Sequence, residues 1–350
     1  MLRKILNIAL ISFWVLTASA QMRELVFDEV VPTNEPPKID GKLDDPCWKN
    51  AMVHDKYYAY FKENPPRASA KTEMRLLYDE KGLYLGIINF EPNIAKLKKN
   101  ISTPDAQDTW TDDCAELYFD RYADGIGYRR FCINCIGTMN DTMRLDEANM
   151  RSEWSADGWT AKTSINSDNW VIEAFFPWSD LGQKPAVGEV WTMLHNRYSP
   201  QDGANSGYSC SSPGGNLVNT KNFGFLCFTD GKGKSNHDEI AGIINKRVAP
   251  PWGLAIDNGL LKNDGSKVSF EPFEDLLKKQ QTAFDEKMAA CEKAVSTVKN
   301  PEIAKLFEKT KEAYQKVKAN DGKSLSYVLQ LIAMDTVLDD IKWKIELESL

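Results

Sequence analysis

The sequence lacks the short motifs that mark many hydrolases, peptidases and nucleotide-binding enzymes. It contains no GxSxG, HExxH or Walker sequence, and its three histidines, at positions 54, 195 and 237, lie far apart. Cys132 and Cys135 form the only CxxC pair, so the spacing of a zinc finger is absent. We therefore predict no catalytic residues and assign no metal ligands.

Positive charge and long apolar runs are also scarce. The chain has 43 Lys and Arg against 50 Asp and Glu, which gives a net charge of −7. A nucleic-acid partner needs a basic surface, so we expect none. Beyond the N-terminal region no apolar run is long enough for a transmembrane helix, and we expect no membrane span in the mature chain.

The N-terminus has the pattern of an export signal. Arg3 and Lys4 precede a mostly apolar run at 5–16, and Ala18-Ser19-Ala20 fits the small-x-small cleavage rule. The apolar run is too short to span a bilayer. We predict a signal peptide at 1–20, cleavage near Ala20, and a secreted, periplasmic or cell-envelope location.

The seven cysteines do not indicate a redox centre. Cys132 and Cys135 lie in a strand-like run, where residues three apart point to opposite faces. No thioredoxin-like pattern surrounds them. Buried thiols or one structural disulfide are favoured, with the pairing left open.

Residues 21–229 read as a chain of short β-strands. Ala115, Leu117 and Phe119 alternate with more polar neighbours, and turn residues separate similar runs across this region. Many short strands at regular spacing favour a sandwich or barrel. We predict a mainly β protein with an antiparallel, jelly-roll-like β-sandwich.

The C-terminal part has a different pattern. Residues 230–270 contain several Gly and Pro breaks and are predicted as an irregular linker. Apolar residues keep helical spacing over 271–350, interrupted near Pro301 and Gly322. We predict a helical hairpin or three-helix bundle there, with a protein partner as one role for these helices.

Aromatic residues next to carboxylates suggest two kinds of site. Trp110 lies in a polar loop before Asp112 and Asp113, where an indole ring could stack on a sugar or pack over the sandwich edge. The carboxylates of this region also raise the question of a glycosidase pair, whose separation a sequence does not give. Trp159, Trp170, Trp178 and Trp191 are expected to pack in the core or at its rim.

Several stretches, in order, resemble family 9 carbohydrate-binding modules over about residues 30–229. The resemblance implies an antiparallel β-sandwich whose characterised members clamp a sugar between two Trp rings. The matching stretches are PKIDGKLDDPCWKNA (37–51), LLYDEKGLYL (76–85), WTDDCAEL (110–117), NCIG (134–137), WVIEAFFPWSDLG (170–182), GEVWTMLHNR (188–197) and NFG (222–224).

The resemblance implies a set of carbohydrate-binding residues. The first clamp Trp corresponds to Trp110 and a polar Glu to Glu116, while the family's Asn and a Gln correspond to Asn134 and a position near His195. The full predicted set is Trp110, Glu116, Asn134, His195 and Arg197.

Two positions depart from the family pattern. Leu217 stands where the second clamp Trp is expected, and Cys132 stands where an Arg would hold sugar hydroxyls. Tyr198 and Tyr208 are candidates for a different second wall. Some family members bind calcium, so a structural calcium ion is the one cofactor that the resemblance allows.

Three hypotheses about function follow. The leading one is non-catalytic binding of a glycan or polysaccharide by an exported accessory protein of polysaccharide catabolism. The second is a structural or protein-interaction protein whose sandwich has lost sugar binding, favoured by Leu217, Cys132 and the C-terminal helices. The third is a glycoside hydrolase-associated enzyme.

Overall fold

The computed structural model describes most of the chain, and the predicted signal peptide lies outside the described residues. None of the described helices is long and apolar enough to cross a membrane. The described residues are 23–59, 68–146, 148–199, 208–212, 220–231, 236–257, 259–319 and 325–348.

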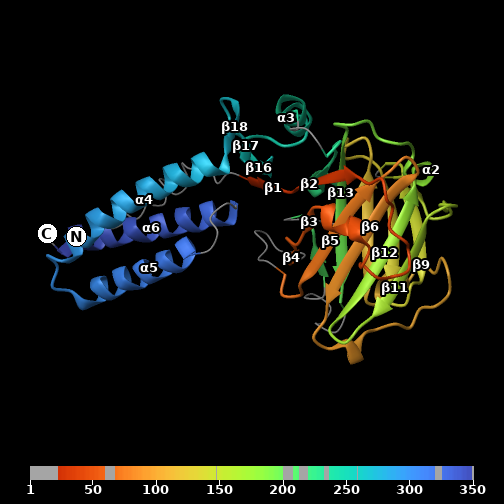
Figure 1. Cartoon of the computed structure of the whole chain (residues 1–350), viewed down its shortest axis with the longest axis horizontal. Helices are drawn as coiled ribbons and strands as arrows, with labels where there is room; N and C mark the ends of the chain where they lie inside the picture. The colour runs from red at the N-terminus through yellow and green to blue at the C-terminus, as the bar shows by residue number, and fades with distance from the viewer. Residues whose placement is uncertain are drawn as a thin grey trace. The chain divides into compact units, whose positions relative to one another are not determined.

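These residues form two compact units, 23–252 and 253–350. The first unit holds almost all the strands, drawn from red to green in Figure 1. Its strands are β1 (Arg23–Leu25), β2 (Phe27–Pro32), β3 (Val53–His54), β4 (Tyr58–Ala59), β5 (Thr72–Tyr78), β6 (Gly82–Phe90), β7 (Cys114–Asp120), β8 (Tyr128–Asn134), β9 (Met139–Arg144), β10 (Met150–Arg151), β11 (Thr160–Ile165), β12 (Asn169–Pro177), β13 (Val190–Tyr198), β14 (Tyr208–Cys210) and β15 (Gly224–Phe228). Its helices are the 3₁₀ turns η1 (Pro46–Asn50), η2 (Ile94–Lys96), η3 (Thr109–Thr111) and η5 (Thr220–Asn222), with α2 (Trp178–Leu181) and α3 (His237–Asn245).

Strand β2 joins the two halves of the sandwich. Phe27–Val30 pair in parallel with β15, and Val31–Pro32 pair in parallel with β5. One half continues from β15 through β13, β7, β8 and β9 to β10, and the other from β5 through β6 and β12 to β11. The ladders within each half are antiparallel. The predicted antiparallel β-sandwich is confirmed, with the two ladders of β2 as its parallel exception.

The apolar residues of alternate strand positions form the main core. Ala115, Leu117 and Phe119 all point into it, as the alternation in the sequence predicts. Trp159, Trp170, Trp178 and Trp191 lie in the same core, so the expectation of packing roles is confirmed. The face of β7 that carries Glu116 points to the other side of its sheet.

The IDG stretch of the sequence is held by one buried carboxylate. Glu173 Oε2 accepts three consecutive backbone N–H bonds, from residues 40, 41 and 42, at 2.9–3.1 Å. Its Oε1 accepts from the indole of Trp48 at 3.0 Å. Gly41 has φ +85°, and a Cβ there would lie 2.9 Å from the backbone carbon of Thr163. This loop therefore needs both the glycine and the carboxylate.

The region 230–270, predicted as an irregular linker, contains regular structure instead. Asn236 caps α3 by accepting the backbone N–H of Glu239. Strands β16 (Trp252–Ile256), β17 (Gly259–Asn263) and β18 (Val268–Pro272) follow, with β17 and β18 paired in register. The Gly and Pro residues that suggested a linker lie between or at the ends of these elements, because turn residues also connect short strands.

The second unit contains the predicted helices, and the described residues form three of them. They are α4 (Phe273–Val295), α5 (Pro301–Ala319) and α6 (Leu325–Glu348). Phe284, Phe307 and Leu338, one from each helix, share one apolar core. Of the two alternatives left open by the sequence, the structure has the three-helix arrangement.

We predict that Glu173→Gln lowers the free energy of unfolding by about 3 kcal/mol. A neutral amide has one acceptor oxygen and an NH₂ group that does not accept, so either the backbone N–H groups or the Trp48 indole would lose a partner in a buried place. Urea unfolding at neutral pH measures the loss. The control is Glu80→Gln, which removes an exposed carboxylate paired with Lys184 and should change stability by less than about 0.5 kcal/mol. Equal effects of the two substitutions would contradict the anchoring role.

Candidate functional site

Trp110 is an exposed aromatic ring a few residues before β7. It lies in η3 and is 43% exposed. Its ring centroid is 6.5 Å from that of Tyr198, and the two ring planes meet at 45°. Tyr198 pairs with Cys114, two residues before Glu116, so this aromatic pair and Glu116 share one face of the sheet. Of the two readings of Trp110, exposure favours a platform over packing at the sandwich edge.

The two acidic residues that follow this ring are buried and hold the neighbouring loop. Asp112 accepts the backbone N–H groups of Asn100 and Ile101 at 3.0 and 2.8 Å. Asp113 accepts that of Lys98 at 2.7 Å. Burial raises the pKa of Asp113 to about 6. These carboxylates hold residues 98–101 in place beside the platform.

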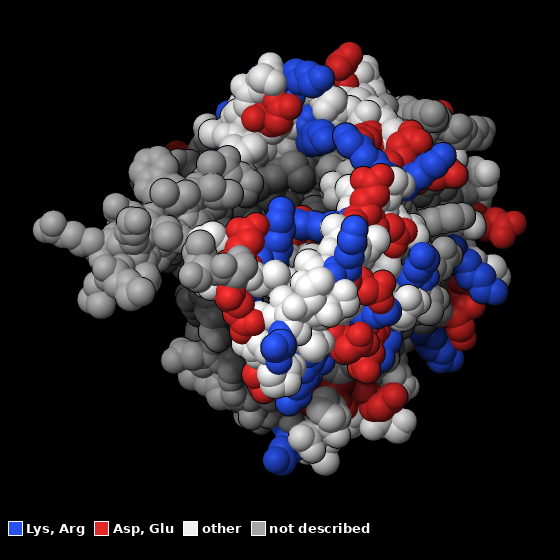
Figure 2. Space-filling model, turned by 90° about the vertical axis from the view of Figure 1, so that its left-hand side faces the viewer, with Lys and Arg blue, Asp and Glu red and all other residues white. Residues whose placement is uncertain are grey.

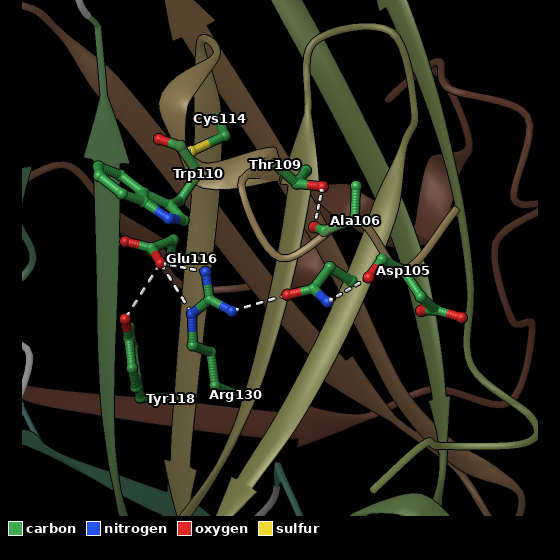
Figure 3. Close-up of polar contacts among 9 residues, drawn as sticks. Asp105, Ala106, Thr109, Trp110, Cys114, Glu116, Tyr118 and Arg130 are labelled. Atoms are coloured by element: carbon green, nitrogen blue, oxygen red, sulfur yellow. Dashed lines mark hydrogen bonds and ion pairs between the residues drawn. The ribbon is translucent and has the colours of Figure 1, made fainter. Parts of the chain in front are cut away.

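Glu116 is a buried carboxylate held by an arginine on the next strand. Its Oε1 accepts from Arg130 Nε at 2.8 Å and Nη2 at 2.5 Å, and from the Tyr118 hydroxyl at 3.2 Å. Arg130 Nη1 also donates to Asn140 Oδ1 at 2.9 Å (Figure 3). Burial disfavours the charged guanidinium, but the adjacent Glu116 carboxylate raises the pKa of Arg130 above its ordinary value. Arg130 and Glu116 therefore form a fixed salt bridge on this face of the sheet.

Arg130 is the residue that the sequence comparison missed. Cys132, where the family pattern has an Arg, lies directly opposite Glu116 in the β7–β8 register. Arg130 lies two residues earlier on the same face and reaches Glu116 diagonally. The two-residue period of the strand Tyr128–Asn134 could have identified Arg130 from the sequence, because it places residues 130 and 132 on one side of the strand.

A row of polar side chains crosses four strands at the level of Glu116. Asn196 of β13 pairs with Glu116, Glu116 with Cys132, and Cys132 with Asn140 of β9. The amide of Asn196 is buried, and neither of its polar atoms has a hydrogen-bond partner among the described residues. Glu116 Oε2 also has none within the described ranges. Two unpaired polar groups thus lie side by side on this face.

Asn134 shares the face but has a structural role. Its amide donates to the Ile101 carbonyl and to Asp112 Oδ2, at 2.8 and 3.1 Å. Its Oδ1 accepts the backbone N–H groups of Ile136 and Thr138. The side chain closes the β8–β9 turn and has little capacity left for a ligand.

His195 and Arg197 lie on the opposite side of the sheet, so the prediction that groups them with Trp110 does not hold. They pair with Leu117 and Ala115, which point into the core. Arg197 donates to the carbonyls of residues 71 and 90 and to Glu91 Oε2, and so ties β13 to the facing half of the sandwich. The alternation of a strand forbids both of these residues from sharing a face with Asn196.

His195 belongs to a buried polar cluster in the interior. Its Nδ1 lies 2.5 Å from the Tyr57 hydroxyl, and burial lowers the pKa of His195 to about 3. Nearby, His54 Nδ1 lies 2.8 Å from Asp28 Oδ1. Burial opposes the charge on His54, yet Asp28 raises its pKa above the ordinary value. One histidine is therefore held neutral and the other is stabilised in its charged form.

The remaining sequence predictions concern cysteines and other carboxylates. Cys135 lies in the core while Cys132 lies on the opposite face, as predicted, and six of the cysteines are buried thiols. Leu217 and the side chain of Tyr208 are outside the described residues.

Asp141 accepts from the backbone of residue 156 and the Trp159 indole, so it is a further anchoring carboxylate. Among the described residues, no three His, Cys, Asp or Glu side chains cluster as metal ligands would.

The two buried histidines predict opposite pH effects on stability. His195 contributes stability that is present above pH 6.5 and lost as the pH falls toward 3, because the unfolded chain takes up a proton that the folded chain does not. His54 contributes stability that is present below pH 6.5 and lost as the pH rises through its higher folded pKa.

We expect His195→Gln to flatten the acid limb of the stability curve by up to about 1.4 kcal/mol per pH unit below pH 6.5. His54→Gln should flatten the curve above pH 6.5 and leave the acid limb in place. Urea unfolding at intervals from pH 4 to pH 9 measures both. An acid limb in His195→Gln as steep as in the wild type would show that the histidine is not the buried neutral group.

Comparison with known proteins agrees with the resemblance in the sequence. A carbohydrate-binding module of family 9 from Caldicellulosiruptor kristjanssonii, solved with cellotriose, is 18% identical with a TM-score of 0.42, over 60% of this chain and 96% of that one. A candidate carbohydrate-binding protein from Bacteroides uniformis ATCC 8492 is 16% identical with a TM-score of 0.45, over 59% and 99%. No curated protein matched the chain. Residues 39–229, more than half of the chain, match the family described as carbohydrate family 9 binding domain-like, and the chain belongs to that family.

Proposed function

We propose that the sandwich binds carbohydrate without catalysis, on the face of β7, β8, β9 and β13 that carries Glu116. The observation that carries this proposal is an exposed Trp110 ring next to a row of buried polar groups with unused hydrogen-bonding capacity. Sugars combine apolar C–H faces with hydroxyl groups, so a ring beside polar groups matches both parts. Family membership supports the same conclusion.

The polar row explains how hydroxyl groups would be recognised. Glu116 Oε2 would accept a hydroxyl proton, and the Asn196 amide would accept or donate. Leaving such groups buried and unpaired costs about 1–3 kcal/mol each, which a bound hydroxyl would recover. Two N–H bonds from Arg130 fix the orientation of the Glu116 carboxylate, so the acceptor is in place before a ligand arrives.

The aromatic pair gives the site an open shape. Tyr198 meets Trp110 at 45°, whereas a parallel clamp would need two facing rings. One sugar face would stack on the indole and one edge would touch the phenol. The open angle between the two rings suits a sugar within a chain or at its end, and a binding assay would identify the glycan.

The cellular context of the proposal comes from the sequence. We propose that the signal peptide at 1–20 directs export and that the protein is an accessory component of extracellular or periplasmic polysaccharide catabolism. Figure 2, which views the molecule from the left-hand side of Figure 1, shows basic and acidic side chains interspersed on that face, with no large patch of one sign. Failure to release reducing sugar from polysaccharides that the protein binds would support the non-catalytic part.

We predict that Trp110→Ala lowers the association constant for a bound oligosaccharide about fivefold or more, because stacking on an aromatic ring is worth on the order of 1 kcal/mol or more. Isothermal titration with cellotriose, extended to a glycan array, measures the change. The control is Trp343→Ala, which removes an exposed indole from α6 in the other unit. Wild-type affinity in Trp110→Ala would refute the platform, while unchanged unfolding curves for both variants exclude misfolding as the cause.

Arg130→Lys should weaken sugar binding about tenfold. One ammonium group does not reproduce the fork that holds Glu116 and Asn140 together, so the carboxylate would lose its fixed orientation. Titration of the variant gives the affinity, and circular dichroism checks the fold. Arg151→Lys, on an exposed strand residue, is the matched control. Full affinity in Arg130→Lys would mean that the salt bridge has no part in recognition.

A protein-interaction role for the helical unit is the second candidate. Trp343 and Leu347, one turn apart on α6, are both exposed, although such residues are usually buried. Light scattering of the full chain tests for self-association, and Trp343→Ala should weaken any that is found. A monomer at all concentrations would remove self-association as the reason for this exposure.

A further inference from the structure

Two arginines converge at the end of the sandwich where β7 finishes. Arg121 follows the last residue of β7, and Arg129 is the second residue of β8. Both guanidinium groups approach Gly182, which follows the short helix α2, labelled at the upper right of Figure 1. A Cβ on Gly182 would lie 2.8 Å from Arg121 Nη1 and 3.3 Å from both terminal nitrogens of Arg129. The two cationic groups therefore reach one common point.

Within the described residues, neither guanidinium forms an ion pair at salt-bridge distance. The buried Nε of Arg129 has no hydrogen-bond partner in the described part of the chain. Burial, followed by repulsion from Arg121, lowers the pKa of Arg129. Asp180 is the acidic residue whose charge acts on Arg129 and raises its pKa, while its oxygens accept from the backbone of Gly158 and the Ser179 hydroxyl. Two like charges are thus held together with one acidic residue in the vicinity, and among the described residues neither is paired with a carboxylate at salt-bridge distance.

Neither the helix dipole of α2 nor the interaction between the two arginines themselves explains why the two guanidinium groups lie so close together. Helix α2 has only four residues, so the field at its C-terminus is too weak to hold two cations. Like charges at short range destabilise a fold unless something offsets their repulsion. An oxyanion would do so, because a guanidinium matches a carboxylate or sulfate with two parallel N–H bonds.

Aromatic faces flank the pair. Arg121 lies over the ring of Tyr122 at 4.7 Å, and Arg129 lies 6.0 Å from the ring of Trp154. Tyr122 is 70% exposed. A guanidinium pair binds an anion, and an adjacent exposed ring gives a sugar's C–H face a surface to stack on.

We propose that Arg121, Arg129 and Tyr122 form a second carbohydrate subsite, selective for a sugar that carries an oxyanion, either the carboxylate of a uronic acid or a sulfate ester. This subsite lies at the opposite end of β7 from Trp110, about 20 Å away for a seven-residue strand. It does not depend on the platform proposed for neutral sugar. A chain of mixed composition could occupy both.

Titration of the full chain with trigalacturonic acid and with a sulfated galacto-oligosaccharide tests the subsite. Binding of either sugar supports it and identifies the oxyanion. Arg121→Gln and Arg129→Gln should each weaken that binding at least tenfold, while Trp110→Ala and the charge-matched Arg151→Gln should leave it unchanged. Cellotriose binding should instead weaken in Trp110→Ala and stay unchanged in Arg121→Gln and Arg129→Gln. A failure of the oxyanion subsite is therefore distinguishable from a failure of the platform at Trp110.

Thermal unfolding separates recognition from a structural role. Because the pair repels itself, Arg121→Gln without ligand should have a Tm equal to or above that of the wild type, and the acidic sugar should raise the Tm of the wild type only. Absence of binding by both acidic sugars, or wild-type affinity in both Gln variants, would overturn the proposal. Inorganic sulfate binding as tightly as either sugar would also overturn it, because the site would then recognise only the anion.

Discussion

The two-residue alternation of β-strands controls what each side of the sandwich can do. On β13, His195 and Arg197 point inward and Arg197 connects the two halves, while Asn196 points outward and meets Glu116. Adjacent residues of one motif therefore have opposite roles. A one-residue change of register would exchange them, placing the inter-sheet contacts of Arg197 in solvent and Asn196 in the core. The packed core fixes the register, and the register fixes the candidate site.

Much of the family's sequence pattern describes scaffolding rather than ligand contacts. Glu173 holds the IDG loop through four hydrogen bonds, and Asp112 and Asp113 hold the loop before β7. Buried carboxylates that accept several N–H bonds are costly to replace, because an unpaired buried donor would remain. In this chain such residues hold their loops without any ligand contact being needed. The loop before β7 also carries the exposed ring at position 110.

On the face that carries Glu116, the guanidinium group comes from position 130 instead of position 132, so a cation still lies next to the carboxylate. The family's Arg position holds Cys132, yet a guanidinium still reaches Glu116 from Arg130 on the same side of β8. A long side chain spans the diagonal between neighbouring strands, so a shift of two residues is tolerated. Position-by-position comparison with the family therefore underestimates the polar character of this face. The second aromatic ring also comes from a different part of the chain, since Tyr198 of β13 lies near Trp110.

The sequence by itself determined the strand periods, the three helices and the family, because hydrophobic periodicity and motif order are local properties. It also predicted Trp110 and Glu116 as carbohydrate-binding residues. Only the tertiary structure decided that His195 and Arg197 face the interior, that Asn134 closes a turn, and that residues 230–270 fold into a helix and strands. It alone brought Arg130 to Glu116, and Arg121 to Arg129. Those outcomes depend on strand register and on contacts between distant residues, which no local pattern records.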